Sequence, residues 1–404
     1  MTKRNFPDFL SAYVDYARDG FCPESFHFWT GVSILAAALE RKVSLRGGKV
    51  HYVPNFYIML VSPPGAGKST AIEPGVELIE LLRKEHDTNF RIIPEQVTEP
   101  ALVDMMKIVD RFQVPGLAEF VPQSAGYFYA SEASSSALQN VCGDFIATMT
   151  AMYDCPKFFR KKLKSDQRPT EIECVCMNML SGSTFDYLKN LVNATTVMGG
   201  FASRVTYVVQ KTRPERTPKW GAVSDRDRKL RRELLADLAE IHRLAGPMTP
   251  DAGFISAWEA YQAEFGRFLT SIGDPRMESL LARKATHVTK LAMLLSVSES
   301  SSLIVTGKHF EQAASLIEDV TMDAGHVLST AIIANKESQE GMTELIIHSV
   351  KESGGRIRTP RLKRMITQSG NDLNRFQPTF DMLIASGRLR LTGSDTVELL
   401  VDTD

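Results

Sequence analysis

Residues 55–70, NFYIMLVSPPGAGKST, constrain the fold of this chain more than any other segment. An unbroken apolar run passes into a turn rich in proline and glycine, and the turn ends in Gly-Lys-Ser. SPPGAGKS matches the signature G-x-x-x-x-G-K-[ST] of a phosphate-binding loop, except that Ser62 stands where the first glycine is usual. Because such a loop needs a strand before it and a helix after it, the segment predicts an α/β fold.

The composition of the loop predicts how it would hold a nucleotide. Glycines have no Cβ, so the backbone N–H groups of the turn can face the phosphates, and the N-terminus of the next helix favours the same negative charge. Lys68 is expected to contact the β and γ phosphates of ATP, and the Ser69 hydroxyl is expected to ligate Mg²⁺. The predicted nucleotide-binding residues of the loop are Pro64, Gly65, Ala66, Gly67, Lys68, Ser69 and Thr70.

Strand and helix patterns alternate from the loop to about residue 210. Apolar runs predict strands at 56–62, 90–96, 126–132, 172–184 and 204–210. Helical patterns lie between them, and Pro74 and Gly75 should disturb the second turn of the first of these helices. The alternation predicts a mostly parallel sheet flanked by helices.

Segments of different character flank this α/β core. Residues 7–42 and about 222–335 carry apolar residues at helical spacing, and the polar stretch 335–341 predicts a linker. The remaining segments predict helix, helix, helix and hairpin, which is the order of a winged helix. The predicted domains are an N-terminal helical segment at 1–45, a phosphate-loop core at 46–215, a helical lid at 216–335 and a winged helix at 342–404.

Charge and cysteine content limit the function classes. The formal net charge is −1, so attraction to DNA must come from local patches. The five cysteines include no Cys-x-x-Cys pair, which is typical of reduced thiols rather than of a zinc site. No apolar run approaches the roughly 20 residues that a membrane helix needs, and the first residues are a poor signal peptide. We expect a cytoplasmic protein with no membrane partner.

The strand predicted at 126–132 ends in Ser131-Glu132. A phosphate-loop ATPase usually carries Asp-Glu at such a position, with Asp for Mg²⁺ and Glu for the attacking water. Glu132 is therefore predicted to orient or deprotonate water, and the alternative is a solvated glutamate at a strand end. Ser131 could hold Mg²⁺ only indirectly, so weak hydrolysis, or a role in binding alone, stays open.

The loop and its flanks resemble the helicase-like AAA+ ATPases of phages, prophages and plasmids. SPPGAGKS is similar to their GPPGxGKS loop, and FHFWTGVSILAAALERKV before it and VTEPALVDMM after it resemble the same proteins. The resemblance implies an ATP-dependent DNA helicase or translocase in the replication of a phage or other mobile element. It also implies a homo-oligomeric, hexameric ring that acts on single-stranded or forked DNA, with a primase or another replication protein as a partner.

The resemblance also implies a polar sensor at the end of the strand that follows the Glu132 strand. MNMLSGST offers Ser183 or Thr184 for this role, with Asn178 further back. The alternative for Ser183 and Thr184 is a cap of the next helix, a position that Ser and Thr favour.

Two arginines receive roles from the same resemblance. Arg204 in GGFASRV would be an arginine finger on the γ-phosphate of the neighbouring subunit, and the alternative is a surface ion pair. Arg283 in the helical lid would sense nucleotide, with Lys284 or Lys290 as substitutes. The alternative is that Arg283, Lys284 and Lys290 only form the solvent-exposed face of an amphipathic helix.

Basic residues concentrate between the Glu132 strand and the sensor strand, in YDCPKFFRKKLKSDQRPTEI. Cations neutralise phosphates, and the rings of Phe158 and Phe159 offer bases a stacking surface. Some hexameric AAA+ helicases insert a DNA-gripping hairpin at this point, whereas the alternative here is a solvated loop with both rings packed beneath it. The predicted DNA-binding residues are Lys157, Arg160, Lys161, Lys162 and Lys164.

A second basic patch lies in residues 351–390, where lysine and arginine exceed acidic residues by six. In a winged helix the third helix enters the groove of DNA and a wing, here 388–397, follows it. Winged helices also mediate protein contacts, so DNA binding is one of two interpretations. The predicted DNA-binding residues are Arg361, Lys363, Arg364 and Arg375.

Two other functions fit the same residues. One is a helicase loader or replication initiator that remodels DNA or protein without translocating. The other is a nucleotide-gated DNA-binding adaptor with little hydrolysis, which the serine at position 131 favours.

Overall fold

The computed structural model describes residues 4–18, 22–85, 91–139, 143–162, 169–191, 200–212, 224–272, 275–368, 373–392 and 395–400. The chain divides into two compact units, Met1–Leu328 and Ser329–Asp404, and each is described by itself.

A parallel sheet lies at the centre of the first unit. Its strands are β3 (Tyr57–Val61), β4 (Ile92–Ile93), β6 (Phe120–Ala130), β9 (Val175–Ser183) and β10 (Val205–Val209). They follow the order β10-β3-β9-β6-β4, and β5 (Asp110–Gln113) pairs antiparallel with β6. Every residue of β3 and β9 is buried, which is why their sequences, apart from Asn178, are continuously apolar or small rather than alternating. The predicted α/β class and the mostly parallel sheet are confirmed.

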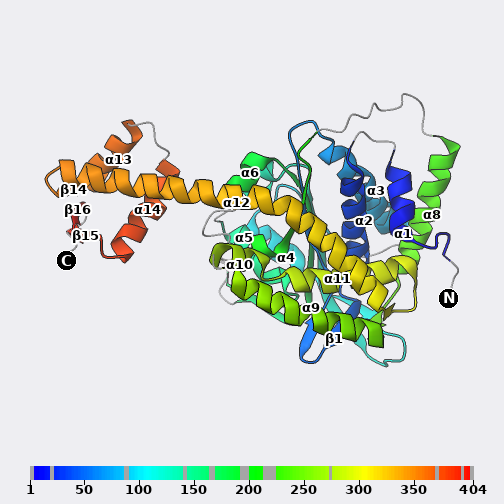
Figure 1. Cartoon of the computed structure of the whole chain (residues 1–404). Helices are drawn as coiled ribbons and strands as arrows, with labels where there is room; N and C mark the ends of the chain where they lie inside the picture. Colours follow the sequence, from blue (N-terminus) through cyan, green and yellow to red (C-terminus); the bar gives the residue numbers. More distant parts are fainter. Residues whose placement is uncertain are drawn as a thin grey trace. The chain divides into compact units, whose positions relative to one another are not determined.

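Helices cover both faces of this sheet. Helices α2 (Glu24–Leu39) and α3 (Lys68–Glu85) pack on each other and on β9, and α5 (Asp144–Tyr153) also packs on β9. Figure 1 shows α5 across the sheet from α2 and α3. Helix α3 is continuous through Pro74. Helix α4 (Glu99–Met106) begins after Thr98, whose side chain caps it by accepting from Ala101 N, and ends before β5.

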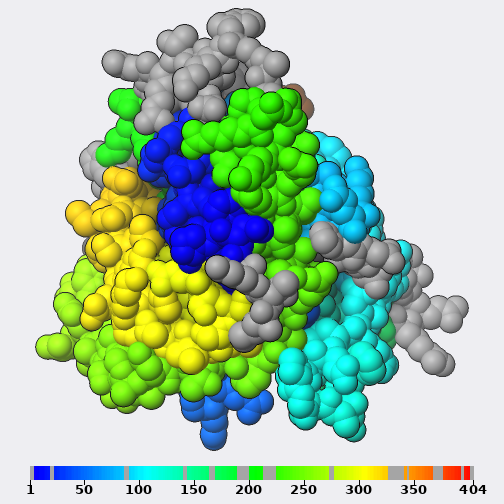
Figure 2. Space-filling view, turned by 90° about the vertical axis from the view of Figure 1, so that its right-hand side faces the viewer, coloured from blue at the N-terminus to red at the C-terminus, as the bar shows by residue number. Residues whose placement is uncertain are grey.

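The N-terminal helices are built into the first unit. Helix α1 (Phe9–Ala17) is capped by Asp8, and the backbone N–H of Leu10 donates to Ser298 Oγ at 2.8 Å. The backbone N–H of Phe6 donates to Asp237 of α8 (Asp225–His242) at 2.9 Å. Figure 2 shows the deep blue α1 beside the green α8 and the yellow segment near residue 300. This segment therefore packs directly against the rest of the unit.

The expected helical lid consists of α8, α9 (Ala252–Ser271), α10 (Pro275–Leu281), α11 (Lys284–Glu299) and the start of α12 (Gly307–Glu352). Helix α12 continues through 335–341, where a linker was expected. NKESQE is polar, but it contains no proline and several good helix formers, so polarity alone does not end the helix. Among the described residues, no helix is long and apolar enough to cross a membrane.

Short strands complete the first unit. Strand β1 (Val43–Gly47) pairs antiparallel with β2 (Val50–Tyr52) and parallel with β11 (Gly246–Pro247). Strand β12 (Thr249–Pro250) pairs with β13 (Ile304–Val305).

The second unit combines helices with a small antiparallel sheet. It contains β14 (Arg356–Arg358), α13 (Thr359–Gln368), α14 (Leu373–Ala385), β15 (Leu389–Thr392) and β16 (Thr396–Leu399), and the strands follow the order β14-β16-β15. The predicted C-terminal hairpin is therefore present as β15 and β16. Residues of the C-terminal part of α12, both other helices and all three strands form one apolar cluster.

Candidate active site

The phosphate loop joins buried strand β3 to helix α3, as its signature predicts. Gly65 and Gly67 have φ values of 77° and 83°, in the left-handed region that residues with a side chain rarely adopt. A Cβ on Gly67 would also lie 2.6 Å from Cys22 Cβ. Both glycines are therefore required by the backbone path of the turn.

Lys68 lies beneath this turn. The residue is 7% exposed, and its Nζ donates to the carbonyls of Ser62 at 3.2 Å and Pro63 at 3.3 Å. Burial lowers the pKa of the Lys68 ammonium, and the negative charge of Glu132 partly opposes this effect. The lysine is thus held by backbone carbonyls and lies within electrostatic range of the predicted catalytic glutamate.

The end of β9 fits tightly between the loop and the Glu132 segment. Ser62 N donates to Ser183 O at 3.2 Å. A Cβ on Gly182 would lie 2.3 Å from Ser131 O and 3.4 Å from Lys68 Cβ. Gly182 was not predicted as a site residue, and it permits the close approach of these two segments.

Two carboxylates follow neighbouring strands at this edge. Glu132 follows β6, is half-buried, and accepts a hydrogen bond from Ser134 Oγ at 3.3 Å. Glu95 follows β4, and its Oε1 accepts from Ser131 N at 2.5 Å. Glu95 was not among the predicted site residues, although an acid two residues after the end of a short apolar strand was an available signal.

The sensor candidates have different surroundings. Ser183 is fully buried at the end of β9, and its Oγ donates to Thr184 O at 3.3 Å. Thr184 Oγ1 accepts from Tyr187 N at 3.4 Å, so Thr184 caps α6 (Phe185–Leu191), the alternative considered for it. Asn178 lies earlier in β9, where its Oδ1 accepts from Phe56 N at 2.9 Å. Of the three, Ser183 is directly joined to the phosphate loop.

Arg204 and Arg283 lie together at the opposite edge of the sheet. Strand β10 begins just after Arg204 and aligns Val205 with Tyr57, whereas the phosphate loop follows the other end of β3. Asp154 accepts from Arg204 Nη2 at 2.6 Å and from Arg283 Nη1 at 2.5 Å. The structure therefore brings neither arginine to the phosphate loop of its own chain.

The two lysine substitutes for Arg283 also lie away from the phosphate loop. Lys284 forms an ion pair with Glu318 of α12. Lys290 is buried in α11, and its Nζ donates to Asn55 Oδ1 at 2.6 Å. Asn55 precedes β3, so Lys290 belongs to the same edge as Asp154.

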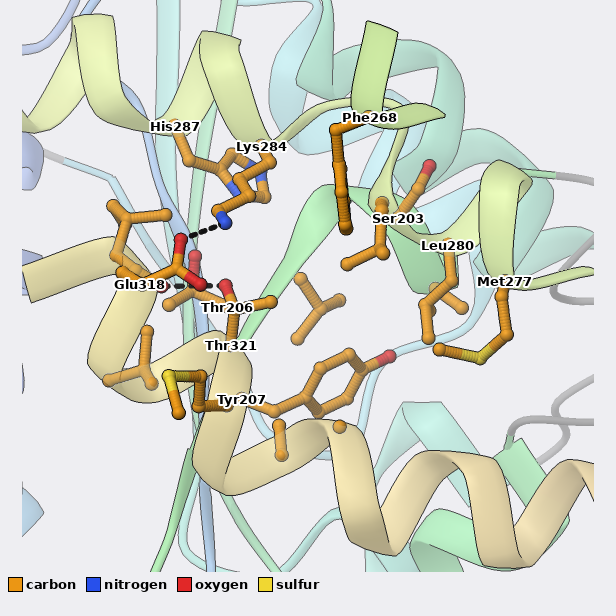
Figure 3. A pocket seen from close by; sticks show the side chains of 18 residues that line it. Ser203, Thr206, Tyr207, Phe268, Met277, Leu280, Lys284, His287, Glu318 and Thr321 are labelled. Carbon is orange, nitrogen blue, oxygen red and sulfur yellow. Dashed lines mark hydrogen bonds and ion pairs between the residues drawn. The ribbon is translucent and has the colours of Figure 1, made fainter. Parts of the chain in front are cut away.

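A mostly apolar cavity of about 210 Å³ lies beside β10 and the Arg204 turn. Figure 3 shows Phe268, Leu280 and Met277 on one side of it and the Lys284–Glu318 pair on another. Tyr207 Oη and His287 Nε2 are buried without a hydrogen-bond partner. Burial, together with the charges of Lys290 and Arg283, lowers the pKa of His287 to about 3.

The basic segment after α5 forms a hairpin. Strands β7 (Phe158–Lys161) and β8 (Thr170–Glu173) pair antiparallel. The ring of Phe158 is 56% exposed with Lys157 Nζ 5.5 Å from its centroid, whereas Phe159 is buried. Lys161 forms an ion pair with Glu99 at 3.2 Å, Arg160 pairs with Glu171, and Lys162 is exposed. Lys164 lies outside the described residues.

In the second unit, Arg361 and Arg364 are exposed on α13. Lys363 is half-buried, and its Nζ donates to Gln377 Oε1 of α14 at 3.0 Å. The side chain of Arg375 lies outside the described residues. The described part of the patch thus places two exposed cations on α13.

The residues at the loop fit a triphosphate with Mg²⁺. The turn adopts the glycine conformations that direct N–H groups inward, Lys68 supplies a cation, and Ser69 is exposed in the first turn of α3. Within the described ranges, no group of three or more His, Cys, Asp or Glu residues could hold a metal ion. Ser69 is the residue of the loop that would ligate Mg²⁺, together with the phosphates.

Comparison with models of protein families finds no match, and comparison with curated proteins finds none either.

Proposed function

We propose that the chain is an AAA+ ATPase that acts on DNA as a helicase or translocase in the replication of a phage or other mobile element. The observation that carries this proposal is the phosphate loop between β3 and α3, with Lys68 beneath the turn and Glu132 beside it. We further propose an oligomeric ring, because Arg204 can reach a phosphate only on a neighbouring subunit.

Each residue has a distinct task in this proposal. Lys68 neutralises charge on the β and γ phosphates, and Ser69 ligates Mg²⁺. Glu132 orients the attacking water, and Ser183 stays within the hydrogen-bonded end of β9 beside the loop. Arg204 of the adjacent subunit stabilises the charge that develops on the γ-phosphate.

Two features support DNA as the partner. The β7–β8 hairpin combines an exposed aromatic ring with exposed cations, which suits stacking on bases and contact with phosphates. The second unit combines helices with a hairpin and exposes Arg361 and Arg364 on α13, which would suit a winged helix that contacts DNA. We propose that the hairpin grips single-stranded DNA and that the winged helix loads or steers it.

ATP hydrolysis with and without single-stranded DNA tests this function. We expect DNA to stimulate turnover and Lys68→Ala to lower it by roughly 10²–10³-fold, the usual effect of removing one preorganised charge-stabilising group. Lys84→Ala, an exposed lysine at the far end of the same helix, is the matched control and should be unchanged. Equal turnover in the Lys68 variant and the control would contradict the proposal, and turnover indifferent to DNA would favour the loader or remodeller.

A second candidate is a nucleotide-gated DNA-binding adaptor with little hydrolysis. Ser131 favours it, because this exposed serine stands where an aspartate usually serves Mg²⁺, while its N–H binds the Glu95 carboxylate. Ser131→Asp keeps that N–H and restores the usual carboxylate. A large rise in turnover would mean that the natural site is hydrolytically poor, and no rise would weigh against the adaptor.

A further inference from the structure

A second cavity lies at the edge of the sheet that carries Arg204. Its volume is about 530 Å³, and residues of β2, α9 and α11 form much of its wall. Cys155, Asp154 and Lys290 line it together. Cys155 therefore forms part of the cavity wall, although it is only 8% exposed.

Cys155 lies opposite Cys176 on an adjacent segment. Val175 N donates to Pro156 O at 3.1 Å, and Cys174 N donates to Lys157 O at 2.8 Å, so the two segments run antiparallel. Cys155 and Cys176 are the next residues of these two segments, and their side chains are hydrogen-bonded to each other. A disulfide bridges cysteines whose Cα atoms are about 4.4–6.8 Å apart, a separation that side chains in hydrogen-bonding contact permit.

Arg41 fixes the two segments to each other. Its Nη1 donates to Cys155 O at 2.5 Å and to Val175 O at 2.7 Å. Both cysteines also belong to one small apolar cluster with Val53 and Ala125. The thiols are therefore held in register, and their approach needs no large movement of the backbone.

The surroundings favour a reactive thiolate at Cys155. Burial by itself raises the pKa of this thiol, but the hydrogen bond from Cys176 and the charges of Lys290 and Arg41 outweigh burial and lower the pKa to about 7. The hydrogen bond to Cys155 raises the pKa of Cys176. The pair thus consists of one nucleophilic sulfur and one protonated sulfur.

Cys155 also has a strained backbone for a residue with a side chain. It follows the end of α5 with φ of 48°, and its N–H donates to Met152 O at 3.2 Å, which is the helix-ending position that glycine favours. Glycine would adopt this backbone conformation with less conformational strain than cysteine. What cysteine adds at this position is its thiol.

We propose that Cys155 and Cys176 are a redox-active dithiol that small hydroperoxides, entering the cavity, convert to an intrachain disulfide. The Cys155 thiolate attacks the peroxide oxygen, the O–O bond breaks, and a sulfenic acid forms as the departing hydroxide or alkoxide takes a proton from solvent and leaves as water or alcohol. The Cys176 sulfur then attacks the Cys155 sulfur, its proton goes to the departing hydroxyl, and a second water leaves. The dithiol loses two electrons and the peroxide gains them.

Hydrogen peroxide treatment of the full chain tests the proposal, with peptide mapping by mass spectrometry under non-reducing conditions. We expect a peptide linked through Cys155 and Cys176 that is lost on reduction. Cys176→Ser should abolish the link and leave a sulfenic acid on Cys155 that dimedone traps. Cys174→Ser, which removes a buried thiol from the same segment, should leave the link unchanged.

Two further variants separate reactivity from folding. Cys155→Gly suits the left-handed backbone, so it should fold and lack the link. Lys290→Met should slow peroxide oxidation of Cys155 by roughly three- to tenfold near pH 7, because the thiolate loses a stabilising charge. Oxidation of Cys155 no faster than that of Cys174, or a link formed mainly through Cys174, would overturn the proposal.

Discussion

The two ends of the parallel strands hold their charged groups in different ways. At the carboxyl ends of the strands (the carboxyl edge), backbone groups hold them: carbonyls accept from Lys68, and Ser131 N donates to Glu95. At the amino edge, one carboxylate, Asp154, binds both Arg204 and Arg283. A group held by the backbone can take a ligand without losing a charged partner, whereas in the proposed ring Arg204 would exchange Asp154 for a phosphate.

The largest effect, on ATP affinity, is expected from adding a methyl group between β9 and the Glu132 segment. Gly182→Ala would place a Cβ 2.3 Å from Ser131 O, so β9 and the Glu132 segment must move apart. We expect ATP affinity to fall more than about 100-fold, since a displaced site loses several contacts at once. A fluorescent ATP analogue measures this, with circular dichroism as the check on folding.

Gly266→Ala is the matched control for that substitution. Gly266 lies within α9, and a methyl group added there would meet no atom within 4 Å. The change should therefore leave ATP affinity unaltered and raise helix stability by up to about 1 kcal/mol. Wild-type ATP affinity in Gly182→Ala would contradict this expectation, because it would mean that β9 and Ser131 can separate enough to admit a methyl group without disturbing the site.

A smaller effect is expected from breaking the amino edge. Asp154→Asn leaves Arg204, with a side chain 12% exposed, without its carboxylate. We expect the free energy of unfolding to fall by about 1–2 kcal/mol. The loss is modest because the Asp154 side chain is 40% exposed, so solvent screens its charge. Urea denaturation of the single and double variants with Arg204→Ala measures the coupling. A coupling near zero would mean that Asp154 does not hold Arg204.

Acid should also weaken the amino edge, through His287. The pKa of this buried imidazole is about 3 in the folded chain, below the ordinary value of 6.5, so the unfolded chain binds more protons between these values. Stability should therefore fall by up to about 1.4 kcal/mol per pH unit as the pH drops from 6.5 towards 3. His287→Gln should flatten this part of the curve, and an unchanged slope would contradict the assignment.

The last effect is expected at the β7–β8 hairpin, in DNA binding rather than in ATP binding or folding. Phe158→Ala should weaken binding of single-stranded DNA by roughly 5- to 100-fold, the range for loss of one stacked base. Phe120→Ala is the matched control, because Phe120 is similarly exposed at 57% but lies at the start of β6. Fluorescence anisotropy measures both affinities, and equal losses in the two variants would rule out a specific role for Phe158.

The carboxyl edge was largely predictable, because its signals are local in the sequence. Strands β3 and β9, apart from Asn178, are continuously apolar or small because both of their faces are buried, and the glycines of the loop adjoin Lys68. Gly182 and Glu95 were not predicted, because their roles depend on contacts with Ser131. Ser131 follows β6, whereas Gly182 lies in β9 and Glu95 follows β4. Such contacts follow from strand order, which the alternation of elements does not specify.

The amino edge was hardly predictable. Asp154 is 50 residues from Arg204 and 129 residues from Arg283 along the chain, so no spacing rule connects them. A hairpin at β7–β8 was suggested by the resemblance alone, with a solvated loop as the alternative, because short strands with charged residues resemble loops in the sequence pattern. Helix α12 replaced an expected linker, since polar residues without proline can continue a helix.

A mixing experiment tests most directly the central claim, that Lys68 and Arg204 act on one ATP from different subunits. Lys68→Ala and Arg204→Ala chains should each be inactive alone. A mixed oligomer regains sites that combine an intact loop from one variant with Arg204 from the other. The account predicts that an equal mixture hydrolyses ATP at about a quarter of the natural rate if subunits assort at random. A mixture that forms mixed oligomers by native mass spectrometry but stays inactive would contradict it.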